Sequence, residues 1–146
     1  MHVLIDADGC PVTDLAIGLA RQNHIPCTIF CDTAHQISRP DARAVTVSKG
    51  ADSADLALVA HVQPGDIVVT QDYGLAALCL SRRAIPIHQD GMIYTEENID
   101  SLLFFRAAAQ KVRRSGRRLR GPARRTKEQD RAFVASLERL LQEVRP

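Results

Sequence analysis

The sequence has no apolar run near the roughly 18 residues that a membrane-spanning helix requires. It also places two carboxylates, Asp6 and Asp8, where a secretory signal would carry its apolar segment. These absences argue against a helical membrane protein and predict a cytoplasmic protein without a membrane partner. The length of 146 residues suits one ordinary domain, and the apolar fraction of 45% is sufficient for a buried core.

Cysteine and histidine lack the spacings that zinc sites and redox pairs need. The four cysteines form no CxxC pair, and the five histidines form no HxxxH pair. We therefore predict no zinc site and expect reduced thiols in or near the core. Cys10 precedes Pro11 at an expected helix start, where the helix dipole favours a thiolate, but the nearby carboxylates of Asp6 and Asp8 oppose that effect. We interpret Cys10 as a small packing residue.

Positive charge is scarce in most of the chain and concentrated at its end. Residues 1–105 carry 6 basic and 13 acidic side chains, whereas residues 106–146 carry 13 basic and 4 acidic ones. We interpret 1–146 as a single domain, with an acidic α/β core over 1–105 and a basic linker and C-terminal helix over 106–146.

The basic segment attracts polyanions, of which nucleic acid is the commonest. Aromatic residues are absent from its arginine-rich part, so we expect contacts to phosphates rather than stacking on bases. The residues alone do not decide between RNA and DNA, and RNA is the first expectation. The candidate nucleic-acid-binding residues are Arg113, Arg114, Arg117, Arg118, Arg120, Arg124 and Arg125.

Apolar runs and helix signals alternate along the first 90 residues. Strands are predicted at 2–6, 27–31, 44–47, 66–70 and 84–88, and helices at 12–23, 52–62 and 74–82. Pro86 places the last strand at an edge, because proline donates no backbone hydrogen bond. Helices are also expected from Glu96 towards Arg114 and after the capping-box sequence that starts at Thr126. This order predicts an α/β fold with a mostly parallel five-stranded sheet and C-terminal helices.

Aspartates follow several of the predicted strands. Asp6 and Asp8 come after the first strand, Asp72 comes after the fourth, and Asp55 lies in the helix that follows the third. In an open parallel sheet, functional groups collect at the carboxyl ends of the strands, where the connections reverse direction. If the first and fourth strands are neighbours, they lie about 4.8 Å apart. Clustered carboxylates suit Mg²⁺ or Mn²⁺, so we expect Asp6, Asp8, Asp55 and Asp72 to be the metal ligands.

Several segments together resemble one known family. They are the sequences VLIDADGCPV at 3–12, GADSAD at 50–55, GDIVVTQDYGLA at 65–76, NID at 98–100 and GP at 121–122. The combination is similar to the YaiI/YqxD family of uncharacterised bacterial proteins and covers nearly the whole chain. The resemblance implies a PIN-like three-layer α/β/α domain, whose nuclease members hold Mg²⁺ or Mn²⁺ with three or four acids. Asp6, Asp55 and Asp72 are the nearest matches to those acids.

These observations predict a metal-dependent nuclease, in which a metal-bound water attacks a phosphodiester. The expected catalytic residues are Asp6, Asp8, Asp72 and Thr70, with Thr70 positioning water or phosphate. One alternative is a PIN-like module that binds nucleic acid without cleaving it. A less favoured alternative is a phosphatase, because DADG at 6–9 is similar to the DxDG motif of haloacid-dehalogenase-type enzymes, in which the first Asp attacks phosphorus.

Overall fold

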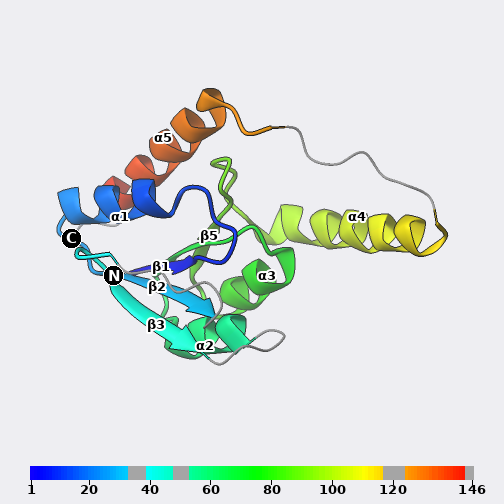
Figure 1. The fold of residues 1–146 in the computed structure, drawn as a ribbon, viewed down its shortest axis with the longest axis horizontal. Helices are drawn as coiled ribbons and strands as arrows, with labels where there is room; N and C mark the ends of the chain where they lie inside the picture. Colours follow the sequence, from blue (N-terminus) through cyan, green and yellow to red (C-terminus); the bar gives the residue numbers. More distant parts are fainter. Residues whose placement is uncertain (33–38, 48–52, 117–123, 144–146) are drawn as a thin grey trace.

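A computed structural model describes residues 1–32, 39–47, 53–116 and 124–143 of the chain. Short apolar runs form the strands β1 (Val3–Asp6), β2 (Cys27–Asp32), β3 (Arg43–Val47), β4 (Ile67–Val69) and β5 (Ile85–Ile87). The helices are α1 (Thr13–Gln22), α2 (Ser53–His61), α3 (Tyr73–Ser81), α4 (Glu96–Arg114) and α5 (Lys127–Glu143). The predicted α/β class with C-terminal helices is confirmed (Figure 1).

The five strands form one sheet in the order β3-β2-β1-β4-β5, and every pair is parallel. The chain runs outward from β1 through β2 to β3, and then returns to add β4 and β5 on the other side of β1. β1 and β4 are therefore neighbours at the point where the connections reverse direction. Pro86 lies in β5 at the edge of the sheet, as predicted.

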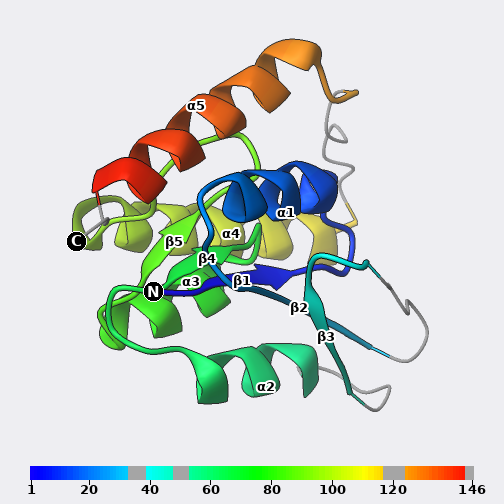
Figure 2. The same ribbon diagram turned by 90° about the vertical axis from the view of Figure 1, so that its left-hand side faces the viewer.

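Helices cover both faces of the sheet, which makes three layers (Figure 2). Alternate residues of β1 point to opposite faces, so Val3 and Ile5 pack in one core with α1 and α5, whereas Leu4 packs in the other with α2 and α3. The apolar stripe expected on the last helix is buried, and it consists of Phe133, Leu137, Leu140 and Leu141. No helix in the described ranges is long and apolar enough to cross a membrane.

α4 is only partly packed against the rest of the molecule. Its first turns contact α3 through a third core that contains Ile99 and the buried Tyr94. Thr95 and Asn98 form the capping box that begins the helix. The C-terminal half extends away from the sheet (Figure 1), and most of its side chains are exposed.

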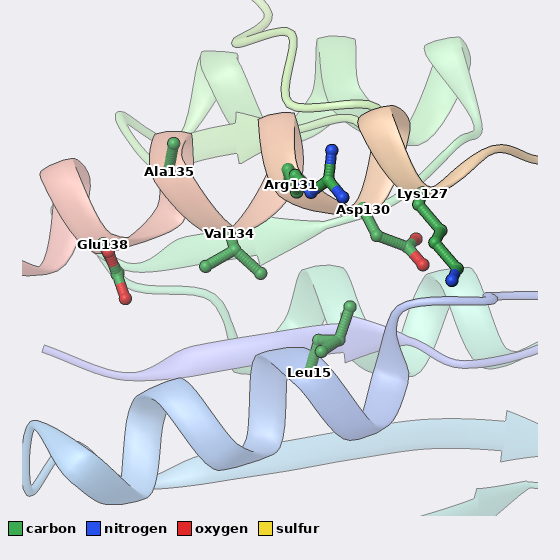
Figure 3. Close-up of a pocket in the computed structure, with 7 residues that line it drawn as sticks. All are labelled: Leu15, Lys127, Asp130, Arg131, Val134, Ala135 and Glu138. Carbon is green, nitrogen blue, oxygen red and sulfur yellow. The ribbon is translucent and has the colours of Figure 1, made fainter.

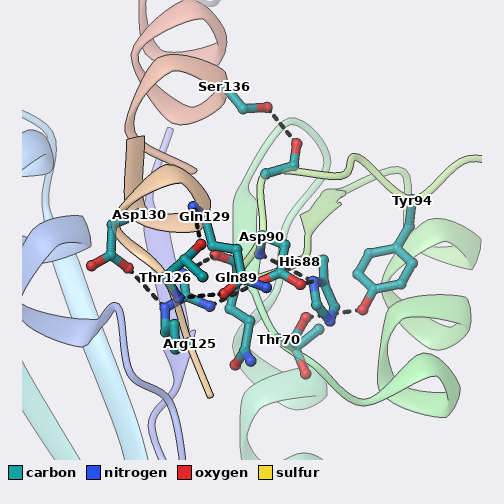
Figure 4. A network of polar contacts seen from close by, with 11 residues as sticks. Thr70, His88, Gln89, Asp90, Tyr94, Arg125, Thr126, Gln129, Asp130 and Ser136 are labelled. Carbon is teal, nitrogen blue, oxygen red and sulfur yellow. Dashed lines mark hydrogen bonds and ion pairs between the residues drawn. The ribbon is translucent and has the colours of Figure 1, made fainter. Parts of the chain in front are cut away.

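Arg125 fastens α5 to the connection between β5 and α4 (Figure 4). Its Nη1 donates to Asp90 Oδ1 at 2.7 Å, its Nη2 donates to the carbonyl oxygen of Gln89 at 2.6 Å, and its Nε donates to Asp130 Oδ1 at 2.7 Å. The Arg125 side chain is only 20% exposed. A three-way contact of this kind holds the start of α5 in place, because Asp90 and Gln89 belong to the connection and Asp130 belongs to the helix.

Gly91 permits the close approach of this connection to α5. Its φ of +91° lies in the left-handed region, and a Cβ added there would lie 2.6 Å from the carbonyl oxygen of Ala132. The hydroxyl of Ser136 donates to the carbonyl oxygen of Gly91 at 2.7 Å. A side chain at position 91 would therefore push α5 away from the connection between β5 and α4.

We expect Gly91→Ala to lower the free energy of unfolding by roughly 2–4 kcal/mol, because backbone strain adds to a clash with the backbone of α5. Gly65→Ala is the matched control, since its φ of +87° is similar but no atom lies within 4 Å of the added Cβ. That control should lose only about 1–2 kcal/mol. Urea unfolding of both variants measures the difference, and equal losses would contradict the clash.

Candidate active site

A cavity of about 300 Å³ opens at the carboxyl ends of the central strands. We call it the acid cavity, and its lining residues are Asp6, Asp8, Asp32, Ala54, Asp55, Gln71 and Asp72. The structure thus brings together the four aspartates that the sequence indicated as metal ligands. It adds Asp32, the last residue of β2, which the sequence analysis did not single out although it follows the same strand-end pattern.

The turn after β1 directs Asp8 towards β2. The backbone N–H of Ala7 donates to the carbonyl oxygen of Phe30 at 3.0 Å, which extends the pairing of β1 with β2 by one residue. The carboxylate of Asp8 then accepts from the backbone N–H of Asp32, with its Oδ2 at 3.3 Å. Gly9 continues the turn at a φ of +71°, and a Cβ there would lie 3.3 Å from Gln71 Nε2. Glycine therefore leaves room for Gln71 beside the turn.

Thr70 fixes the orientation of Asp6. Its hydroxyl donates to Asp6 Oδ2 at 2.9 Å and accepts from the backbone N–H of Asp72 at 3.0 Å. The Tyr94 hydroxyl donates to the carbonyl oxygen of Thr70 at 3.1 Å (Figure 4). Thr70 is only 2% exposed, so its hydroxyl reaches Asp6 rather than the open part of the cavity. This geometry makes Thr70 a positioning group for Asp6.

Asp72 caps the N-terminus of α3. Its Oδ1 accepts from the backbone N–H groups of Gly74 at 2.8 Å and Leu75 at 3.2 Å. Arg106 of α4 also reaches this oxygen, with Nη1 at 3.3 Å. The hydrogen bonds that Asp72 accepts from the described residues thus all end on Oδ1, which leaves Oδ2 for another ligand.

Burial raises the pKa of Asp6 to about 6, and the negative charges of Asp72 and Asp8 act in the same direction. The hydrogen bond from Thr70 opposes the rise without cancelling it. A carboxyl group whose pKa is higher in the folded chain than in the unfolded chain destabilises the fold once it ionises. At neutral pH the ionised carboxylate of Asp6 therefore lowers the stability of the fold.

The donor set of the acid cavity fits a hard divalent cation, because carboxylate oxygens are the ligands that Mg²⁺ and Mn²⁺ prefer. Within the described ranges, no three His, Cys, Asp or Glu side chains already converge as a metal site. Asp6, Asp8 and Asp72 each accept hydrogen bonds from protein groups. The metal ligands expected from the sequence remain a prediction.

The expected nucleic-acid-binding arginines lie in different surroundings. Arg113 and Arg114 are exposed in the last turn of α4, and Arg124 is exposed just before α5. Arg125 is instead engaged in the ion pairs that hold α5. The remaining three, Arg117, Arg118 and Arg120, lie outside the described residues. Arg106, which the sequence analysis did not propose, contacts Asp72 of the cavity.

The cysteines do not form a reactive centre in the described structure. All four are free thiols. Burial raises the pKa of the Cys10 thiol, and it raises the pKa of both Cys27 and Cys79 to about 12. The thiolate form is thereby disfavoured, in agreement with the interpretation of Cys10 as a packing residue.

A larger hollow of about 420 Å³ lies between α1 and α5 (Figure 3). Leu15, Val134 and Ala135 form its apolar part, and charged side chains of α5 surround them. It lies on the face of the sheet covered by α1 and α5, away from the face that α2 and α3 cover. Its lining includes none of the residues of the acid cavity.

The family model for the uncharacterised YaiI/YqxD family matches residues 4–143. The chain belongs to this family. It is 50% identical to a UPF0178 protein of Exiguobacterium sibiricum over 98% of both chains. It is 43% identical to a UPF0178 protein of Alkaliphilus oremlandii over 98% of this chain and 92% of the relative. A UPF0178 protein of Ruminiclostridium cellulolyticum is 45% identical over 94% of this chain and 90% of the relative.

The comparisons confirm the family resemblance that the sequence motifs indicated. No solved structure gives a significant match to this YaiI/YqxD protein. The three-layer α/β/α architecture therefore comes from the chain's own structure, and its likeness to PIN domains remains a prediction.

We expect Asp6→Asn to stabilise this YaiI/YqxD protein by about 1–3 kcal/mol at neutral pH, because the amide removes a buried charge and still accepts from Thr70. The gain should shrink as the pH falls from about 6 towards 3.8, since Asp6 itself becomes protonated in that range. Thermal unfolding across this pH range in a chelating buffer measures the effect. The exposed Asp100→Asn serves as a control and should change little. A loss of stability in Asp6→Asn would show that the charge is not a cost.

Proposed function

We propose that the acid cavity hydrolyses phosphodiester bonds of nucleic acid with Mg²⁺ or Mn²⁺ as cofactor. The observation that carries the proposal is the convergence of five aspartates, from the ends of three strands and the start of α2, on one half-buried cavity. Burial raises the pKa of Asp6, and the negative charges of Asp72 and Asp8 add to the rise, so the arrangement costs stability. A divalent cation bound among the carboxylates would offset their negative charge, which would explain why the aspartates lie together.

The oxygen atoms best placed for a cation are those that accept no hydrogen bond from the described residues. They are Oδ1 of Asp6 and Oδ2 of Asp72, since the other oxygen of each carboxylate is engaged. Asp8 and Asp55 stand in the same cavity and complete the predicted ligand set. When bound there, Mg²⁺ or Mn²⁺ lowers the pKa of a coordinated water and offsets charge on phosphate oxygens.

The protein's own groups supply orientation and charge. Thr70 holds Asp6, and the N-terminus of α3 holds Asp72, so the two carboxylates face the cavity in fixed positions. Gln71 is exposed beside them and offers a carboxamide to water or phosphate. Arg106 brings a positive charge to the rim, where it can attract a phosphate oxygen towards the carboxylates.

Nucleic acid is the substrate class that the surface charge favours. Exposed cations gather at the end of α4, where Lys111, Arg113 and Arg114 occupy the last turn. Arg124, just before α5, is also exposed. Such a surface attracts a phosphate backbone in a salt-dependent way without reading its sequence. We take RNA before DNA as the first substrate to test.

Asp6→Asn and Asp72→Asn should each weaken Mn²⁺ binding at least about tenfold and remove cleavage, because each substitution takes away one ligand charge. Asparagine retains the N-cap of α3 at position 72, so the fold is preserved. Calorimetric titration of Mn²⁺ and cleavage of labelled single-stranded RNA and DNA measure the two effects. The exposed Asp100→Asn is the matched control.

Binding and phosphatase assays on the same variants separate the two alternative functions. Salt-sensitive binding of RNA without turnover would favour the non-catalytic module. Release of phosphate from a phosphomonoester, lost in Asp6→Asn while strands stay intact, would favour the phosphatase. Unchanged strand cleavage in either aspartate variant would overturn the assignment of the site.

A further inference from the structure

A second hollow of about 330 Å³ adjoins the acid cavity. We call it the leucine hollow, and its lining residues are Asp55, Leu56, Asp72, Gly74, Leu75, Leu78 and Arg106. Asp55 and Asp72 line both spaces, so the two spaces adjoin at these residues. A ligand that extends from one space into the other would lie close to both carboxylates.

The walls of the leucine hollow are of two chemical kinds. Leu56 of α2 is 67% exposed and Leu78 of α3 is 49% exposed, so two helices present aliphatic side chains to one open space. Arg106 of α4 stands at the same hollow with a side chain that is 45% exposed. The combination fits a ligand with a flat apolar part and an anionic part, and it fits a free inorganic anion poorly, because two carboxylates face the same space.

Gly74 leaves room for Arg106 beside α3. It lies in the first turn of α3, where glycine is less favourable than alanine by about 1 kcal/mol. A Cβ at this position would lie 3.3 Å from both Arg106 Nη1 and Asp72 Oδ1. The helix thus lacks a side chain at the place where the guanidinium crosses it, and this observation is independent of the shape of the hollow.

The guanidinium has capacity for a second anion. Its ion pair with Asp72 uses Nη1, and Nε and Nη2 donate no hydrogen bond to the described residues. A guanidinium fork binds phosphate oxygens with two parallel hydrogen bonds. Asp72 therefore holds Arg106 in position without using all of its donors.

We propose that the leucine hollow binds one nucleotide of a single-stranded nucleic acid, with its base against Leu56 and Leu78 and its phosphate on Arg106. The inference rests on the proposed function, since it assigns the nucleotide next to the bond that is cleaved. Bases in a duplex are stacked on both faces, so only an unpaired base lies against the leucines. The shared wall at Asp72 places the phosphate between the hollow and the acid cavity.

The experiment uses the full chain, a fluorescein-labelled single strand and a chelator, so that binding is measured without metal or turnover. The double variant Leu56→Asn, Leu78→Asn and the variant Arg106→Gln should each weaken binding about five- to tenfold. The matched controls are Leu15→Asn, an exposed leucine of α1, and Arg131→Gln, an exposed arginine of α5. These controls should stay within about twofold of the unchanged protein.

A strand of abasic nucleotides distinguishes a base contact from a merely structural effect. The unchanged protein should prefer the normal strand, and the double leucine variant should lose that preference. Arg106→Gln should weaken both strands by similar factors, because it acts on phosphate. Equal binding of both strands by the unchanged protein, or no binding of either, would overturn the nucleotide site.

The two proposals fail in different ways. Base-dependent binding in chelator, with no cleavage when Mn²⁺ is added, would overturn the hydrolase and support the nucleotide site. Cleavage that requires Asp6 but is unchanged in the leucine and Arg106 variants would support the hydrolase and overturn the nucleotide site.

Discussion

The parallel pairing of β1 with β4 is the constraint on which the candidate site depends. It places the end of β1, at Asp6, beside the residues that follow β4, so that Thr70 can donate to Asp6 while it accepts from Asp72. Sixty-four positions separate Asp6 from Thr70 in the sequence. The buried apolar residues of both strands hold this register, since a slip of one residue would turn their side chains to the wrong face. The chemistry of the cavity is therefore a consequence of how the two cores are packed.

The acid cavity shows how a protein tolerates an arrangement that does not favour folding. Each local contact stabilises one carboxylate: a hydroxyl for Asp6, the N-terminus of α3 and a guanidinium for Asp72, and a backbone N–H for Asp8. Only the guanidinium among these groups carries a full positive charge. The raised pKa of Asp6 reflects chiefly its burial, and the negative charges of Asp72 and Asp8 add to it. Such residual cost is typical of groups kept for a ligand rather than for the fold.

The rule that functional groups collect at the carboxyl ends of parallel strands predicted the positions of several cavity aspartates from the sequence. It could not predict contacts between side chains of elements that are far apart in the sequence. Asp6 ends β1 and Asp72 lies three residues beyond β4, so their meeting required only that β1 and β4 be neighbours. Asp32 follows the same rule, because it is the last residue of β2. Arg106 gave no such signal, because its contact with Asp72 depends on how α4 packs against α3. The density of positive charge in the sequence predicted that Arg125 binds nucleic acid like its neighbouring arginines. Its ion pairs with Asp90 and Asp130 are visible only in the tertiary structure.

α4 extends from the acidic part of the molecule to the basic segment. Its first turns pack against α3, its Arg106 contacts Asp72, and its last turn carries exposed cations. Arg113 follows Arg106 by seven residues, close to two helical turns, so both side chains project from one face about 10 Å apart along the axis. Phe104 and Phe105 are 69% and 66% exposed and lie on other faces of the helix. For a strand bound as proposed, this face offers a line of phosphate contacts that leads from the basic end of the helix to the carboxylates. The acid cavity repels a polyanion, whereas the basic face of α4 attracts one. An acidic site that acts on polyanions requires such an attractive surface beside it.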